Sequence, residues 1–274
     1  MKMRHRLLTL PLVVLLAVAA SCRYAGRAFG PKDEGGIYLI IAVKAGAAQL
    51  DQAIAQTVEV MRARCEQLNV YCKVERGVGD KSDRIKLNIS TRHDPERVKG
   101  VILSQGLELR AVVSPLSPSP LQTYPTQDEA AEAAGADKDV LAYPQDADGT
   151  DAGSFRKFIV VEREPIVTGR DILKAEAAVS TAGLKDYVVN FTLRPEGAMR
   201  FGEWTGSHIN NYLAMVLNKQ VRSVAYIKSQ IFDVGQISAR FTKEQAEDTA
   251  VVLNSGDLPA PIEALEEGVY RPGA

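Results

Sequence analysis

The chain has 274 residues, of which 46% are hydrophobic and 24% are charged, a composition typical of a folded protein with one large or two small domains. The formal net charge of −1 excludes the strongly basic surface that marks nucleic-acid-binding proteins, so we expect no nucleic acid as a partner. With three histidines, three cysteines and no CxxC pair, a metal or redox centre is not expected either.

The N-terminus has the pattern of a secretion signal. Basic residues precede an apolar run from Leu7 to Ala20, whose 14 residues fall short of the roughly 20 that a membrane-spanning helix needs. The sequence Ala19-Ala20-Ser21-Cys22 resembles a lipobox, which implies lipidation of Cys22 after export. We therefore expect residues 1–22 to be a cleaved signal peptide and the mature chain to be periplasmic, anchored by lipid to the inner or outer membrane. The alternatives are cleavage near Ser21 that leaves a soluble protein, and an uncleaved anchor.

Residues 23–36 are rich in glycine and charge, which predicts a tether, and residues 37–113 predict a first folded unit. Its apolar residues recur with the spacing of strands and helices in the order βαββαβ, which is the ferredoxin-like arrangement. The predicted elements are strands at 37–43, 70–74, 85–89 and 107–113, a helix over 50–68, and a helix that starts at Asp94-Pro95.

Cys65 and Cys72 fall at a predicted helix end and in the strand that follows. In an oxidising compartment they can form a disulfide, for which the loop length predicts a stabilisation of about 2.5 kcal/mol. Two buried thiols are the alternative, and the spacing does not decide between them.

Residues 114–157 contain several prolines followed by alanine and acidic residues, with few large apolar side chains. This composition predicts a mobile linker with one short helix at 127–134. Residues 158–241 then predict a second unit of strands and one helix. Within it, 213–217 and 221–227 form a hairpin and a helix begins at Pro195.

The last segment, 242–270, predicts a helix and a strand that return to the first unit. Thr242 and Gln245 form a capping box, in which each side chain bonds the other residue's backbone amide. Ala246, Ala250 and Leu253 share one helical face, and Gly256 ends the helix before Pro259 and Pro261.

These blocks resemble the first periplasmic domain of SecD, a membrane component of bacterial protein export, from about Gly36 to Glu267. The resemblance implies an α+β fold with a ferredoxin-like base and an inserted α+β head subdomain. In SecD a membrane helix follows the acidic segment that here is Glu263–Glu267, so we expect a stand-alone lipoprotein without that membrane domain. The matching segments are Val58-x-x-Met61-Arg62-x-Arg64, Asp94-Pro95-Glu96-Arg97, Glu162–Ile172 with its Glu-Pro and Thr-Gly-x-Asp spacing, Phe241-Thr242-x-Glu244-x-Ala246, and Leu253-x-Ser255-Gly256-x-Leu258-Pro259-Ala260-Pro261.

The motif positions are expected to be structural. Pro165 removes one backbone donor and Gly169 permits a tight turn, so this segment predicts a shaped connector. The charged residues of the two base-helix motifs are expected to form solvated faces. The family-motif positions with structural roles are Glu164, Pro165, Thr168, Gly169, Asp171, Thr242, Gln245, Gly256, Pro259 and Pro261.

No motif for catalysis or cofactor binding is found. G-x-S-x-G, H-E-x-x-H and a phosphate loop are all missing from the sequence, and neither His93 nor His208 lies at ligand or triad spacing. Phe201 and Trp204 on the second unit's helix either pack on the sheet or form an exposed aromatic patch, and packing is the expectation. We therefore expect a protein that is not an enzyme and has no cofactor.

Two functional hypotheses remain. The first is a SecD-like periplasmic module that assists protein export by binding unfolded preprotein or a component of the Sec translocon. The second is an envelope lipoprotein that uses the fold as a structural or interaction module unrelated to export. An exposed strand edge or hydrophobic groove on the head would favour the first hypothesis, and a wholly charged head surface would count against it.

Overall fold

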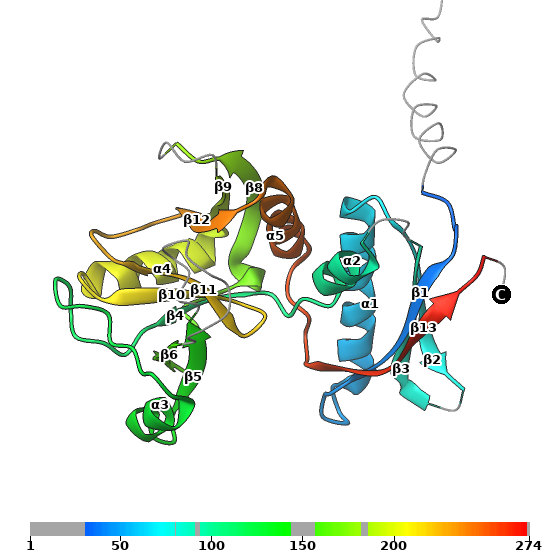
Figure 1. Cartoon of the computed structure of the whole chain (residues 1–274), viewed down its shortest axis with the longest axis horizontal. Helices are drawn as coiled ribbons and strands as arrows, with labels where there is room; N and C mark the ends of the chain where they lie inside the picture. Colours follow the sequence, from blue (N-terminus) through cyan, green and yellow to red (C-terminus); the bar gives the residue numbers. More distant parts are fainter. Residues whose placement is uncertain (1–30, 80, 91–93, 144–156, 182–185, 273–274) are drawn as a thin grey trace, which may run out of the picture.

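The computed structural model describes residues 31–79, 81–90, 94–143, 157–181 and 186–272. It shows an α+β protein of two lobes, a base and a head, which lie side by side (Figure 1). The expected fold class is confirmed. The expected signal peptide, the lipobox with Cys22 and most of the tether 23–36 lie outside the described residues. Within the described ranges, no helix is long and apolar enough to cross a membrane.

The base is an antiparallel four-stranded sheet, with two helices on the face that turns toward the head (Figure 1). Its strand order, β13-β1-β3-β2, is that of a ferredoxin-like fold. Leu39, Ile41 and Leu87 of the sheet pack against Ile54 and Met61 of the first helix in a fully buried core. The elements are β1 (Gly36–Val43), α1 (Leu50–Gln67), β2 (Tyr71–Val78), β3 (Lys81–Ser90), α2 (Pro95–Ile102) and β13 (Ile262–Tyr270).

Strand β4 (Leu107–Ala111) belongs to the head, whereas the sequence placed it in the base. It pairs with β10 (Tyr212–Leu217) on one side and β7 (Val167–Thr168) on the other. The fourth place in the base sheet is taken by β13, which pairs with β1. The alternation of leucines in β4 fits either sheet, so the pattern predicted a strand without identifying its partner. The chain thus leaves the base after α2 and returns only for its last strand.

The described part of the head contains three sheets and three helices. The sheets have the strand orders β11-β10-β4-β7, β12-β9-β8 and β5-β6. The inner face of the second sheet, with Val189, Phe191 and Ile237, packs on Ala246 and Ala250 of α5. The remaining elements are α3 (Gln127–Ala134), β5 (Lys138–Tyr143), β6 (Lys157–Glu162), a 3-10 turn (Gly169–Asp171), β8 (Ile172–Val179), β9 (Tyr187–Leu193), α4 (Pro195–Ser207), β11 (Gln220–Tyr226), β12 (Val234–Phe241) and α5 (Lys243–Ser255).

Residues 114–143, expected to be part of a mobile linker, are built into the head. Helix α3 forms where the sequence predicted it, but Ala130 and Ala134 are buried against Val160 of β6. Strand β5 was not predicted, and it pairs with β6 along its whole length. Alanine is small enough for the helix to approach the strand closely. Tyr124, Val140 and Leu141 of the same segment also pack against the head cores. Residues 144–156 of the expected linker lie outside the described residues.

Helix α5 contacts both lobes. Its apolar face joins the head core, and on its other side Asp248 accepts two hydrogen bonds of 2.8 Å from Arg97 of α2. Glu244 forms a second ion pair with Arg97 at 3.0 Å. Because the Asp248 side chain is only 14% exposed, solvent screens this contact less than a surface pair. Arg97 was expected on a solvated face, and it instead ties the head helix to the base.

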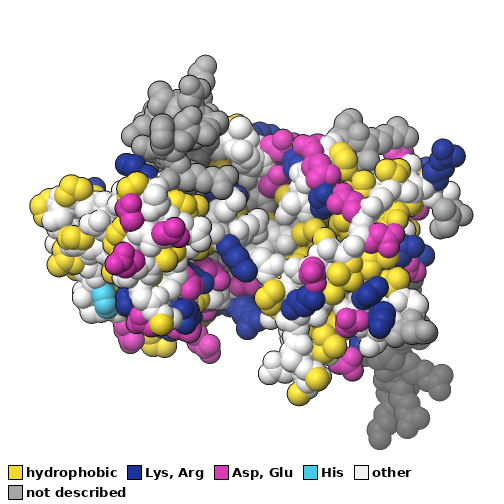
Figure 2. All heavy atoms as spheres, turned by 60° about the horizontal axis from the view of Figure 1, so that its bottom comes forward, with side chains coloured by type: hydrophobic (Ala, Val, Ile, Leu, Met, Phe, Trp, Pro, Cys, Tyr) yellow, Lys and Arg dark blue, Asp and Glu magenta, His cyan; other side chains and the backbone are white. Residues whose placement is uncertain are grey.

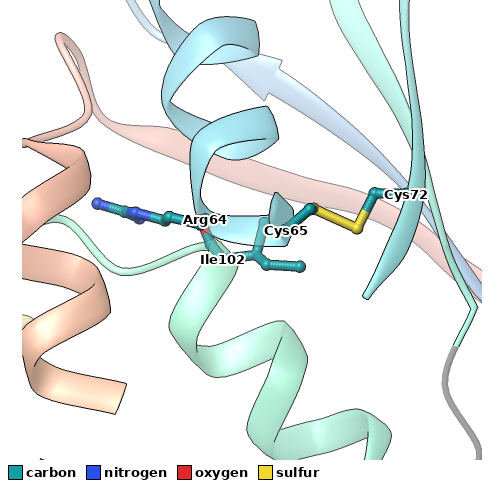
Figure 3. Close-up of a disulfide and its surroundings, with 4 residues drawn as sticks. All are labelled: Arg64, Cys65, Cys72 and Ile102. Atoms are coloured by element: carbon teal, nitrogen blue, oxygen red, sulfur yellow. A yellow bond between two sulfur atoms is a disulfide. The ribbon is translucent and has the colours of Figure 1, made fainter. Parts of the chain in front are cut away.

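Cys65, near the end of α1, and Cys72 in β2 form a disulfide (Figure 3). Their Cα atoms lie 6.1 Å apart, within the range that a disulfide spans without moving the backbone. The bond closes a short turn through Asn69, whose φ is +53°. The disulfide therefore fixes the end of α1 against the edge strand of the base.

Replacing both cysteines with serine should lower the free energy of unfolding by about 2.5 kcal/mol, because the loop they close restricts the unfolded chain. Urea denaturation of the oxidised protein and of the double variant measures the difference. Wild-type protein kept in a reductant is the control, and it should unfold at the same urea concentration as the double variant. If oxidised and reduced wild type had the same stability, the disulfide would not contribute as expected.

Candidate functional site at the junction of base and head

Two segments of chain connect the lobes, and both pass close to the end of α1. Residues 103–106 lead from α2 into β4, and residues 256–261 lead from α5 back into β13. The two connectors are bonded to each other, with the amide of Leu258 donating to the carbonyl of Gln105 at 3.3 Å. Several of the motif positions identified in the sequence lie at this junction.

Arg64 of α1 is fully buried, and it donates hydrogen bonds to groups at the C-terminal ends of α2 and α5. Figure 3 shows that it points to the opposite side of α1 from its neighbour Cys65. The five contacts run from Nη1 to the carbonyl oxygens of Val101 (3.3 Å), Ile102 (2.9 Å) and Ser104 (2.6 Å), from Nη2 to the carbonyl oxygen of Gly256 (2.8 Å), and from Nε to Ser255 Oγ (3.0 Å).

These acceptors lie at the C-terminal ends of α2 and α5, where carbonyl groups lack partners within the helix and the helix dipole is negative. A guanidinium group has enough N–H donors to serve both ends. Burial lowers the pKa of Arg64 to about 10, an effect opposed by the nearby charge of Asp257, and the group stays protonated at neutral pH. The expectation that Arg64 lies on a solvated face is wrong, because its side chain caps two helices.

Asp257, in the returning connector, lies against Gly106, in the connector that enters the head, and against Gly169 of the head itself. A Cβ atom at Gly106 would lie 1.8 Å from Asp257 Oδ1, and one at Gly169 would lie 2.1 Å from the same oxygen. Burial raises the pKa of Asp257 to about 6, although the backbone amides of Gly169, Arg170 and Leu107 favour its charged form. The close approach of this carboxyl group leaves no room for a side chain at Gly169. This is a second reason for glycine there, in addition to the tight turn that the sequence predicted.

The Thr-Gly-x-Asp motif builds the turn that presents Gly169. Asp171 Oδ2 accepts a hydrogen bond of 2.9 Å from the amide of Thr168, and Asp171 Oδ1 accepts one of 2.7 Å from Arg200 of α4. A Cβ atom at Gly197 would lie 2.7 Å from the Cβ of Asp171, so α4 also packs closely on the turn. The pKa of Asp171 lies below its ordinary value, because bonds to Thr168 and Arg200 outweigh the effect of burial.

The tip of the β10–β11 hairpin completes the junction. Asn218 and Lys219 both have positive φ, at +55° and +59°, as a two-residue hairpin turn requires. Asn218 Oδ1 accepts from Ser104 Oγ at 2.7 Å and from the amide of Gln105 at 2.8 Å. The hairpin of the head is thus bonded to the connector that leaves the base.

The other motif positions lie around the junction or at the far end of α5. Gly256 ends α5 with φ of +80°, and Pro261 accepts a backbone hydrogen bond of 2.8 Å from Lys44. Glu164 is exposed and Pro165 half-buried in the segment before β7. Thr242 and Gln245 form a capping box at the start of α5, away from the connectors.

An open cleft of about 940 Å³ lies beside the junction, between the outer face of α1 and the returning connector. Gln52, Gln56 and Arg76 line its base side, and Arg170 and Pro259 line the other. Among the described residues no group of three or more histidines, cysteines or acidic residues could hold a metal ion. The hydrogen bonds of Arg64 and Asn218 show that the junction holds the lobes together.

Arg64, Gly106 and Asp257 form the centre of the junction, and reasoning from the sequence missed their roles. One signal for Arg64 was available: it shares a helix face with Ala53 and Thr57, two small residues that also prove to be buried. Gly106 and Asp257 gave no such signal, because their contact joins residues that are far apart in the chain.

Gly169→Ala should lower the free energy of unfolding by about 2 kcal/mol, because the new methyl group overlaps the carboxyl group of Asp257. The φ of Gly169 is not in the left-handed region, so backbone strain does not add to this effect. In an Asp257→Ala background the same substitution should cost less than about 0.5 kcal/mol, giving a large coupling energy. Equal costs in both backgrounds, measured by urea denaturation, would contradict the contact.

The head also has exposed apolar side chains. Phe201 is buried in the core, as expected, while Trp204 is half-buried and stacks on His208 with 4.3 Å between ring centroids. Among the described residues of the head, six large apolar residues are more than half exposed: Leu116 (55%), Leu173 (55%), Val179 (62%), Met199 (62%), Phe232 (61%) and Val234 (60%). On the face drawn in Figure 2, charged side chains of both signs are interspersed, and hydrophobic ones are visible at the end of the head away from the base.

Comparison with known proteins shows a similarity to SecD. Residues 142–260 match the family model described as the SecDF P1 head subdomain. The chain is 34% identical to the protein translocase subunit SecD of Koribacter versatilis over 247 residues, covering 89% of this chain and 44% of that protein. It is 32% identical to SecD of Aquifex aeolicus over 223 residues, covering 81% of this chain and 40% of that protein.

The chain is SecD-like through both lobes. It spans about two fifths of the length of these SecD proteins, and the shared part includes both the base and the head. Two solved SecDF structures share the fold at 22% sequence identity. One is the super-membrane-facing form, with a TM-score of 0.62 over 86% of this chain and 30% of that one. The other, a chain of a membrane component SecDF that enhances protein export, is covered to 98%, with a TM-score of 0.60 over 84% of this chain.

Proposed function

We propose that this chain is a non-enzymatic, periplasmic SecD-like module that assists protein export by binding unfolded preprotein or a component of the Sec translocon. Its relatives are named protein translocase subunits, and a SecDF protein that shares its fold is described as enhancing protein export. The similarity covers both lobes, so the proposal concerns the base and the head as one unit.

Exposed apolar residues on α4 and around the start of β12 are the observation that carries this proposal. Met199, Phe232 and Val234 are each more than half exposed. Burying such side chains against an apolar partner would gain about 1.5–3 kcal/mol each, which favours a binding role for these residues. The head surface is not wholly charged, which was the feature expected to count against an export role.

The junction gives these residues a fixed support. Arg64 caps helices α2 and α5, and Asn218 bonds the head hairpin to the outgoing connector. These bonds hold the head on the base, which we propose stands at the membrane through a lipid on Cys22. A partner bound at the head would then stay within the reach of the tether from the membrane.

Photocrosslinking in cells tests the proposal. A benzophenone amino acid in place of the exposed Phe232 should capture secretory preproteins or translocon subunits while export is active. The matched control places the same probe at Lys73, an exposed residue on the edge strand β2 of the base, and should capture much less of either. Capture of other envelope proteins alone at position 232 would support the interaction module unrelated to export.

The lipid anchor has its own test. Cells fed a radiolabelled fatty acid should label the wild-type chain, and Cys22→Ala should lose the label entirely because the acylated thiol is gone. Labelling of both forms, or of neither, would contradict anchoring through Cys22.

A further inference from the structure

The edges of the sheets differ in how they are protected against pairing with another strand. In the base, β2 carries Lys73, Glu75 and Arg76, and β13 carries three glutamates. In the head sheet β12-β9-β8, the edge strand β8 carries Lys174 and Glu176. Charged residues along an edge are a common protection against unwanted strand addition.

Strand β8 has a second protection. The side-chain amide of Asn254, at the end of α5, bonds both backbone groups of Ala175. Its Oδ1 accepts from the Ala175 amide at 2.8 Å and its Nδ2 donates to the Ala175 carbonyl at 2.9 Å. These two bonds occupy the backbone groups of Ala175, so an added strand could not pair with β8 at that residue.

Strand β12, at the opposite edge of the same sheet, has its one charged residue, Arg240, near its end, and among the described residues no side chain bonds its backbone as Asn254 bonds that of β8. It pairs with β9 alone, and its sequence from Val234 to Ala239 contains no charged residue. Val234 is 60% exposed, and Phe232, just before the strand, is 61% exposed. A groove of about 480 Å³ runs across the outer face of the sheet beside it, lined by Asn190, Thr192 and Gln236 among others.

We propose that β12 binds an extended, uncharged stretch of unfolded polypeptide by strand addition, with Phe232 and Val234 contacting its apolar side chains. The proposal rests on the proposed function and assigns its binding surface. Main-chain hydrogen bonds supply affinity without requiring a particular sequence, and alternate side chains can enter the adjacent groove. A strand edge thus suits a partner whose sequence varies from one secreted protein to the next.

Fluorescence anisotropy with a labelled peptide of about ten residues, alternating valine and threonine, tests the proposal. Val234→Lys should weaken binding by about tenfold or more, because it places a charge on the edge. Leu173→Lys is the matched control on the protected edge strand β8, where the wild-type side chain is 55% exposed, and it should change affinity less than about twofold. Gln236→Lys is the second edge variant and should behave like Val234→Lys.

A modified peptide separates strand addition from simple apolar contact. Methylation of the backbone nitrogens of two adjacent central residues blocks both edges of the peptide while leaving its side chains in place. Strand addition predicts that this peptide no longer binds measurably. Equal binding of the methylated and unmethylated peptides would overturn the proposal.

The remaining outcomes separate this proposal from the proposed function. If Val234→Lys and Gln236→Lys bind an unfolded secretory protein as well as wild type does, while Met199→Lys does not, the edge assignment fails and preprotein binding stands. If wild type binds neither that protein nor the peptide, both proposals of preprotein binding fail. If sedimentation shows a dimer that Val234→Lys dissociates and no peptide binds, a second copy of the chain occupies the edge and the proposal is overturned.

Discussion

Arg64→Met is expected to lower the free energy of unfolding by about 3–4 kcal/mol. The methionine keeps an apolar stem of similar length but donates no hydrogen bond, so the last carbonyls of α2 and the carbonyl of Gly256 lose their buried donor. Removing a buried charge recovers part of the loss, which keeps the expected value below the sum of five separate bonds. Urea denaturation of the purified chain measures the change.

Arg62 provides the matched control, since it lies two residues earlier in the same helix with a side chain that is 56% exposed. Arg62→Met should change the free energy of unfolding by less than about 0.5 kcal/mol. The loss of unfolding free energy for Arg64→Lys should lie between those of the two methionine variants, because an ammonium group has three donors and lacks the fork of a guanidinium. If Arg64→Met and Arg62→Met had the same small effect, the double-cap role of Arg64 would be wrong.

The stability of the fold is expected to fall as the pH rises through the range set by Asp257. Burial raises the pKa of this group from 3.8 to about 6 in the folded chain, so the folded state binds the proton more tightly than the unfolded state. Protonation therefore stabilises the fold. The contribution is fully present below about pH 4 and is lost as the pH approaches and passes 6, a loss on the order of 3 kcal/mol.

Comparison with Asp257→Asn isolates this contribution, because every other titrating group is common to both proteins. The difference in the free energy of unfolding, wild type minus variant, should fall by on the order of 3 kcal/mol between pH 4 and pH 7 and stay level above that. A difference that is flat, or that rises with pH, would show that the carboxyl group is not held in the buried environment between Gly106 and Gly169.

The sequence predicted much of the fold because its local patterns are strong. The capping box at Thr242 and Gln245 and the apolar face of Ala246, Ala250 and Leu253 identified α5 correctly. The order of elements in the base indicated a ferredoxin-like sheet. The local pattern could not show which strands pair with each other, because the alternation of leucines in β4 is compatible with a sheet in either lobe.

The centre of the junction shows the same limit. The motif drew attention to Gly169 and Gly256, but it did not show that Asp257 lies against Gly169 or that Arg64 bonds the carbonyl of Gly256, because Arg64 and Gly169 are far from residues 256–257 in the chain. An arginine in a helix is solvated far more often than buried, so Arg64 was assigned to the surface. The order of 114–143 was missed for a related reason, because composition does not show that Ala130 and Ala134 meet a strand.

Amide hydrogen exchange with an unfolded secretory protein bound is the most direct test that this chain supports export through its head. The proposal predicts added protection along 234–238 of β12, with little change in β8 or in the edge strands β2 and β13 of the base. No added protection at saturating unfolded protein, or protection confined to the base, would contradict it.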